Sequence, residues 1–232
     1  PAIAACRVTH RGRESSRIAE NSLRIATVIC LPMGVGLSVL AEPIMTIIYP
    51  GSHESGPELL LLMGAASFFV CMALMMNAIL QAGGNEKYPI YSMIIGGIVK
   101  IAVNWFLVAD PGINILGAPI GTLSCYAVMC VMDYIFLCRV MPDRPKLGRI
   151  LARPVLSCAA MGLTAWAVYG LSLRFIGVEP GRLIMALCMC LAIGAAVIVY
   201  LVLTVLTRAV TYEDMKLIPK GEKLARLLRI RP

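Results

Sequence analysis

A single lysine in the middle of a long apolar segment is the residue of this chain that best fits a chemical role. Lys100 lies eleven residues after Pro89, so a helix that starts there carries it about 16 Å along the helix axis. Ser92, Gly96 and Asn104 lie at four-residue intervals around it and form one polar, small-residue helix face. Within a membrane a charge at this depth costs at least about 2.5–3.5 kcal/mol, so it requires protein or water around it. Lys100 would then attract an anionic substrate such as a lipid phosphate, or it is a structural lysine that snorkels or binds carbonyl groups of a neighbouring helix.

Three further polar side chains lie toward the ends of apolar segments. Asn77 and Gln81 share a helix face because they are four residues apart. They either line the same cavity as Lys100 or join neighbouring helices through hydrogen bonds. Asp133 precedes Arg139 by six residues, and the simpler interpretation is an ion pair of these two at the membrane interface. The alternative is that Asp133 binds a proton or a coupling ion.

The chain has few residues that fit catalysis or metal binding. It contains two histidines, no H-E-x-x-H motif and no paired carboxylates of the D-D-x-x-D type inside an apolar segment. Its nine cysteines fall mostly within apolar segments and lack paired C-x-x-C spacing, which indicates packing rather than metal binding. The Gly83-Gly84 turn follows no strand, so it does not predict a nucleotide site. We therefore expect neither an enzyme nor a cofactor.

The elements that must position these residues are membrane helices. Hydrophobic residues make up 59% of the chain and charged residues only 15%, more apolar than a soluble domain of this length could bury. Six apolar segments are long enough to cross a bilayer as helices: Ile25–Tyr49, Pro57–Gln81, Pro89–Val108, Ile113–Leu137, Pro154–Leu173 and Leu183–Leu206. The predicted fold is all-α, a polytopic bundle of about six transmembrane helices.

The basic residues predict the orientation of these helices. Of the 21 Lys and Arg residues, 18 lie in the N-terminal segment, in alternate loops and in the C-terminal tail, whereas 2 lie in the remaining loops. The positive-inside rule therefore places both ends of the chain in the cytoplasm. This distribution also accounts for the net charge of +8 without a nucleic-acid partner. The predicted organisation is a basic segment over 1–24 that ends an upstream helix, a membrane bundle over 25–206 and a basic amphipathic tail over 207–232.

Five stretches, in order along the chain, resemble motifs of the multidrug/oligosaccharidyl-lipid/polysaccharide flippase superfamily. They are Leu31–Leu37 with Leu40–Ile44, Ile79–Gly83, Gly97–Asn104 with its lysine and asparagine, Ile115–Thr122, and Leu217–Gly221. The branch they resemble contains stage V sporulation protein B and related polysaccharide or lipid II flippases of the MurJ type. Pro119 and Asp133 depart from the residues usual in that branch.

The resemblance implies a transporter with two six-helix lobes, of which this chain would hold the ninth to fourteenth helices. The missing N-terminal lobe is then a partner, together with membrane lipids. Such a protein resides in the bacterial plasma membrane and flips a polyprenyl-diphosphate-linked saccharide, lipid II or an oligosaccharide or polysaccharide precursor, from the inner to the outer leaflet. The resemblance assigns substrate binding to Lys100 and, with it, to Asn104, Asn77 and Gln81. Asp133 is the candidate for ion coupling.

Two other functions fit the same composition. A multidrug or cation exporter of the same superfamily would need acidic residues at mid-span, and the candidates Asp133 and Glu42 both lie off-centre. A non-transporting membrane scaffold of glycan synthesis would need no hydrated cavity. Water-accessible positions around Lys100 would therefore distinguish a transporter from a scaffold.

Overall fold

The computed structural model describes residues 12–49, 51, 55–145, 147–176 and 181–207, and all the regular secondary structure in this part of the chain is helical. Six helices are long and apolar enough to cross a membrane, which confirms the predicted all-α fold. These are α2 (Gly12–Val39), α4 (Gly56–Ala82), α5 (Lys87–Val108), α6 (Gly117–Val140), α7 (Leu147–Ile176) and α8 (Arg182–Leu206). A short helix, α3 (Ala41–Ile48), follows α2, and a 3-10 turn, η1 (Asn114–Leu116), precedes α6.

The first membrane helix begins earlier than its hydropathy indicates. Helix α2 starts at Gly12, so the described part of the basic segment continues into the membrane helix without a break. Ser16, Ala19 and Leu23 are buried at helical spacing, and this buried stripe extends the helix beyond the apolar segment. Arg24 and Glu20, four residues apart, form an ion pair at 3.9 Å, and both side chains are partly exposed. The predicted amphipathic tail lies outside the described residues, apart from Thr207.

A proline separates α2 from α3. Pro43 has no backbone N–H, so the carbonyl of Val39 loses the partner that a continuous helix would supply. Leu40 lies at this break with φ −97° and ψ 16°, and both of its backbone groups still bond, its N–H to Gly36 and its carbonyl to the N–H of Ile44. The predicted first segment is therefore two helices.

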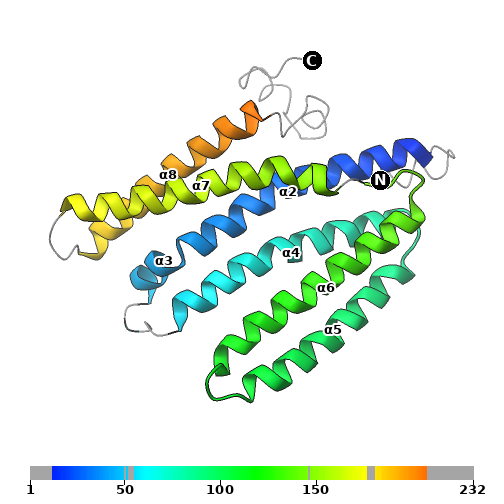
Figure 1. The fold of residues 1–232 in the computed structure, drawn as a ribbon, viewed down its shortest axis with the longest axis horizontal. Coiled ribbons are helices and arrows are strands. Elements are labelled where there is room, and N and C mark those ends of the chain that lie inside the picture. Colours follow the sequence, from blue (N-terminus) through cyan, green and yellow to red (C-terminus); the bar gives the residue numbers. More distant parts are fainter. Residues whose placement is uncertain (1–11, 50, 52–54, 146, 177–180, 208–232) are drawn as a thin grey trace.

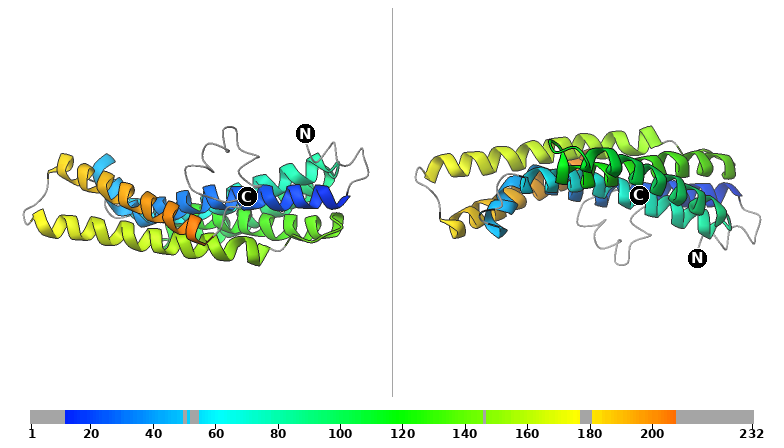
Figure 2. Two further views of the ribbon diagram at one scale, coloured as in Figure 1. Left: turned by 90° about the horizontal axis from the view of Figure 1, so that it is seen from above. Right: turned by 90° about the horizontal axis from the view of Figure 1, so that it is seen from below.

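The membrane helices stand in one curved layer (Figures 1 and 2), in the spatial order α5, α6, α4, α2, α7, α8. Each helix packs chiefly against its neighbours in this row, and α3 lies against α4 and α8. The largest core cluster, which includes Leu23, Met76, Leu80 and Leu137, joins α2, α4 and α6. Many large apolar side chains of the layer remain exposed, as is expected for surfaces that meet lipid or the rest of a larger membrane protein.

Two glycines allow the closest approach within the layer. A Cβ on Gly64 of α4 would lie 2.9 Å from the carbonyl oxygen of Gly34 and 2.8 Å from the backbone nitrogen of Ser38, both on α2. Ser38 also donates from its hydroxyl to the Leu61 carbonyl at 2.9 Å. Small residues at this crossing bring the two backbones together, which is a common way for membrane helices to associate.

We expect Gly64→Ala to lower the stability of the full-length protein by about 1–3 kcal/mol, because the added methyl group meets backbone atoms that cannot move independently. Gly36→Ala is the matched control, since a Cβ there meets nothing within 4 Å. Thermal unfolding of the purified protein measures both. Equal melting temperatures for the two variants would contradict the close approach of α2 and α4.

The predicted orientation is tested by labelling from one side of the membrane. Asp110 and Asp143 are both exposed, and they lie in loops at opposite ends of the helices. In a cysteine-free background, a membrane-impermeant thiol reagent should label Asp110→Cys in intact cells and Asp143→Cys only after permeabilisation. The reverse pattern would invert the topology.

Candidate functional site

The predicted polar helix face lies in the interface between α5 and α6. The two helices are antiparallel, and contacts recur at four-residue steps on both. The Ser92 hydroxyl is hydrogen-bonded to the Asp133 carboxyl group. A Cβ on Gly96 would lie 2.6 Å from Met129, and one on Gly121 would meet the Asn104 side chain. The face predicted from spacing therefore exists, and it is turned toward a neighbouring helix.

Lys100 lies in this interface, halfway along α5, and its side chain is partly buried. Across the interface the lysine lies within electrostatic range of Cys125 on α6. Lys100 forms no ion pair with any residue that the structure describes. Its charge at mid-span is therefore not neutralised by the helices that the structure describes.

Asn104 lies one turn beyond Lys100 on the same face. Its side chain packs against Gly121, whose missing Cβ leaves the necessary room. The Asn104 Oδ1 atom is buried and has no hydrogen-bond partner in the described structure. The structure thus brings Lys100 and Asn104 to one place, where one carries an unpaired charge and the other an unpaired acceptor.

Asp133 is the centre of a second, separate polar cluster. Asp133 and Ser92 are 0% exposed and Asn77 is 6% exposed. With its amide nitrogen turned toward the carboxylate, Asn77 of α4 donates to Oδ1 at 3.1 Å and to Oδ2 at 3.0 Å. The cluster therefore joins three helices, α4, α5 and α6. Ser92 lies two turns, about 12 Å, from Lys100 along α5, so the two polar sites are distinct.

This cluster corrects one interpretation drawn from the sequence. The expected ion pair of Asp133 with Arg139 is wrong, because Asp133 is enclosed between helices whereas the Arg139 side chain is exposed. Six residues along an α-helix turn the side chain to a different face, so the two groups cannot share one environment. The spacing places Ser92 only on the Lys100 face. Its position as a partner of Asp133 depends on the register of α5 against α6.

Asn77 and Gln81 do not act as a pair. Asn77 is buried and hydrogen-bonds to Asp133, which agrees with the alternative that this residue joins neighbouring helices. Gln81, in contrast, is exposed at the end of α4. Neither lies beside Lys100 in the described structure. Of the four predicted substrate-binding residues, only Lys100 and Asn104 therefore lie together on the mid-span face of α5.

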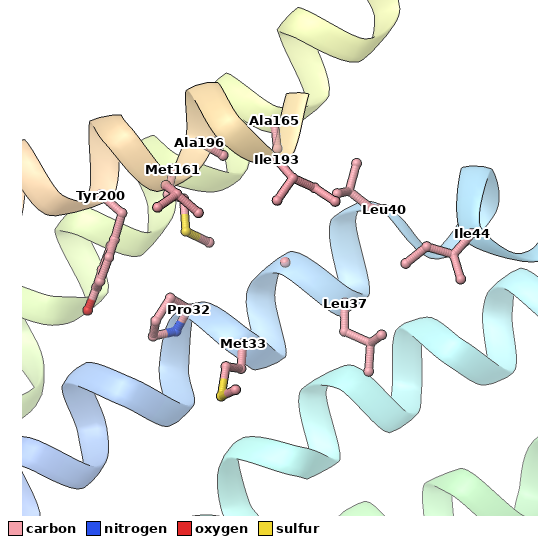
Figure 3. A pocket seen from close by; sticks show the side chains of 12 residues that line it. Pro32, Met33, Leu37, Leu40, Ile44, Met161, Ala165, Ile193, Ala196 and Tyr200 are labelled. Carbon is pink, nitrogen blue, oxygen red and sulfur yellow. The ribbon is translucent and has the colours of Figure 1, made fainter. Parts of the chain in front are cut away.

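An apolar groove of about 450 Å³ lies at the other end of the row, between α2, α3, α7 and α8 (Figure 3). Pro32, Leu37, Met161 and Ala196 are among its lining residues. Tyr200, also in the lining, directs its hydroxyl to the Val28 carbonyl at 2.6 Å, so this polar atom is satisfied. No local pattern predicts the groove, because its lining consists of ordinary apolar residues from four helices.

The described residues offer no other chemistry. Among them no group of three or more His, Cys, Asp or Glu side chains could hold a metal ion. The eight described cysteines are free thiols.

These features define a multi-pass membrane protein with a mid-span cation. The sequence model of the lipid II flippase MurJ family matches residues 1–187, so the chain belongs to this family, whose members are transporters rather than enzymes. The lipid II flippase MurJ of Bacillus subtilis (strain 168) is 28% identical over 180 residues, which cover 74% of this chain and 32% of that protein. The chain thus spans about a third of the length of this relative. No solved structure matches the present chain. The further resemblance to the sporulation branch stays a prediction.

The two residues of the Asn77–Gln81 pair should differ in their effect on stability. Asn77→Ala removes a buried donor from Asp133 and should cost about 1–3 kcal/mol. Gln81→Ala removes an exposed side chain one turn away and should change stability by less than about 0.5 kcal/mol. Thermal unfolding of the full-length variants measures both, and an equal loss for Gln81→Ala would contradict the separate roles.

Proposed function

We propose that the protein flips a polyprenyl-diphosphate-linked saccharide, lipid II or a related oligosaccharide or polysaccharide precursor, from the inner to the outer leaflet of a bacterial plasma membrane. Membership of the MurJ family and the 28% identity to a lipid II flippase support this substrate class. Both ends of the chain would be cytoplasmic, and the rest of the protein would supply the opposing wall of an alternating-access cavity. An ion gradient or the membrane potential would supply the energy.

The observation that carries the proposal is the unpaired charge of Lys100. An ammonium group halfway along a 22-residue membrane helix is unfavourable unless a counter-charge or water reaches it. The described helices provide no acidic partner for it, and a diphosphate is an anion of suitable charge. In this proposal Lys100 donates to a phosphate oxygen during translocation, and Asn104, one turn away, contributes a polar contact.

The apolar groove supports a substrate that carries a hydrocarbon chain. Its lining is apolar, and the groove is partly open rather than enclosed. In the row, α4 lies between α2, which lines the groove, and α6, which faces Lys100. We therefore assign the groove to the polyprenyl chain and not to the diphosphate.

Lys100→Ala should reduce translocation by roughly ten- to a hundredfold, because a hydrogen bond to a charged group contributes about 1.5–3 kcal/mol. Lys100→Arg keeps the charge and should retain part of the activity. Lys87→Ala is the matched control, since Lys87 is an exposed lysine at the start of the same helix. The measurement is the appearance of lipid II headgroups in the outer leaflet of proteoliposomes. Wild-type translocation by a correctly inserted Lys100→Ala protein would remove Lys100 from the mechanism.

A further inference from the structure

The cluster of Asn77, Ser92 and Asp133 is not used by the proposed binding of the diphosphate. It lies near the predicted cytoplasmic ends of α4, α5 and α6, with Asp133 about 10 Å from the end of its helix. Asp133 and Ser92 are 0% exposed within this chain alone. Their environment is therefore complete here, and no other part of a larger protein can touch them in this conformation.

Every group that faces the Asp133 carboxyl is neutral. Asn77 faces it from α4 and Ser92 from α5. The titratable neighbour on α6 is the thiol of Cys130, which bonds to the Phe69 carbonyl at 3.1 Å. No Lys or Arg of the described chain pairs with Asp133. An ionised carboxylate enclosed in this way would lack a counter-charge, and such burial costs several kcal/mol.

The hydrogen bonds of Ser92 fit a neutral carboxylic acid. Its hydroxyl lies within bonding distance of three acceptors, Asp133 Oδ1, the Pro89 carbonyl at 3.1 Å and the Tyr88 carbonyl at 3.3 Å, yet it has one hydrogen to donate. A proton on Oδ1 of Asp133 can be donated to the Ser92 oxygen, and the Ser92 hydrogen then bonds to Pro89. Asn77 donates to the other carboxyl oxygen at 3.0 Å. Both carboxyl oxygens and the Ser92 hydroxyl then have partners, and no charge is buried.

We propose that Asp133 is a proton-binding site whose neutral acid holds the ends of α4, α5 and α6 together. When the proton passes from Oδ1 to entering water, the carboxylate that remains needs hydration, and the helices must part to supply it. Helix α5 is the element that can move, because it lies at the edge of the row and packs almost wholly against α6. The proton site does not depend on the transported substrate. Its coupling to translocation rests on the proposed function, because Lys100 is carried on the same helix.

The first test detects the proton. In the full-length protein at neutral pH, infrared spectroscopy should show the carbonyl stretch of a protonated carboxylic acid, and Asp133→Asn should lack that band. Asp143→Asn, which changes an exposed carboxylate in the following loop, is the control and should keep the band. An unchanged band in Asp133→Asn would overturn the proposal. A second result would also overturn it: a carboxylate band in the wild type, together with stabilisation of the protein by Na⁺ that is lost in Asp133→Asn. Asp133 would then bind a cation and not a proton.

The second test detects the opening of the helices. Cys130, one turn from Asp133 and 8% exposed, serves as a native probe once the other cysteines are replaced. The closed form holds a proton that the open form releases, so opening becomes more favourable as the pH rises. The compared quantity is the Cys130 labelling rate in the wild type divided by the rate in Asp133→Asn. This ratio should rise about tenfold per pH unit over the pH range in which the proton is released. Asparagine mimics the neutral acid, so the ionisation of the thiol itself cancels in the ratio. A ratio that does not change with pH would overturn the proposal.

The two tests are independent of transport. If the acid band and the labelling ratio behave as expected while lipid II is not translocated, the proton site stands and the proposed flippase function fails. If translocation occurs and Asp133→Asn keeps the acid band, the flippase function stands and the proton site fails.

Discussion

The absence of hydrogen-bond partners in a bilayer is the constraint on which this structure depends. The backbone can satisfy its own polar groups only as helices, and the described membrane segments are helical throughout. The same constraint acts on side chains, because a polar group inside the layer must find its partner between helices. The buried Asn77, Ser92 and Asp133 do so, and each contributes from a different helix. Lys100 does not, and its unpaired charge is therefore the feature that a binding function explains best.

Size complementarity explains why α5 and α6 can be so close while they carry polar residues. Gly96 lies opposite Met129, and Asn104 lies opposite Gly121, so a large side chain on one helix meets a missing side chain on the other. Lys100 lies opposite a small residue, Cys125. The long stem of a lysine can therefore run along this interface without separating the helices. The arrangement packs the lysine but leaves its ammonium group without a partner.

The membrane helices could be predicted from the sequence because length and hydropathy alone determine them. The start of α2 could not, because Arg13, Arg17 and Arg24 mask the buried stripe that continues the helix. The site was predictable only where it depends on a single helix, as for the Ser92–Asn104 face. The partners of Asp133 were not, because Ser92 is 41 residues away along the chain and the nearest charge in sequence, Arg139, lies on another face of α6. The apolar groove combines four helices, and no local pattern marks it.

Helix α5 connects the two polar sites mechanically. It is a continuous 22-residue helix whose only proline, Pro89, lies in its first turn, so a displacement at Ser92 must also move Lys100. The hydrogen bonds that hold Ser92 contribute roughly 1–3 kcal/mol, and about 1.4 kcal/mol changes a two-state equilibrium tenfold. If Asp133 binds a proton as proposed, the loss of that one proton is sufficient by this measure to change which position of α5 predominates. In that case the position of Lys100 would depend on the protonation of Asp133, which lies two turns nearer the predicted cytoplasmic end. No contact between the two side chains would be needed.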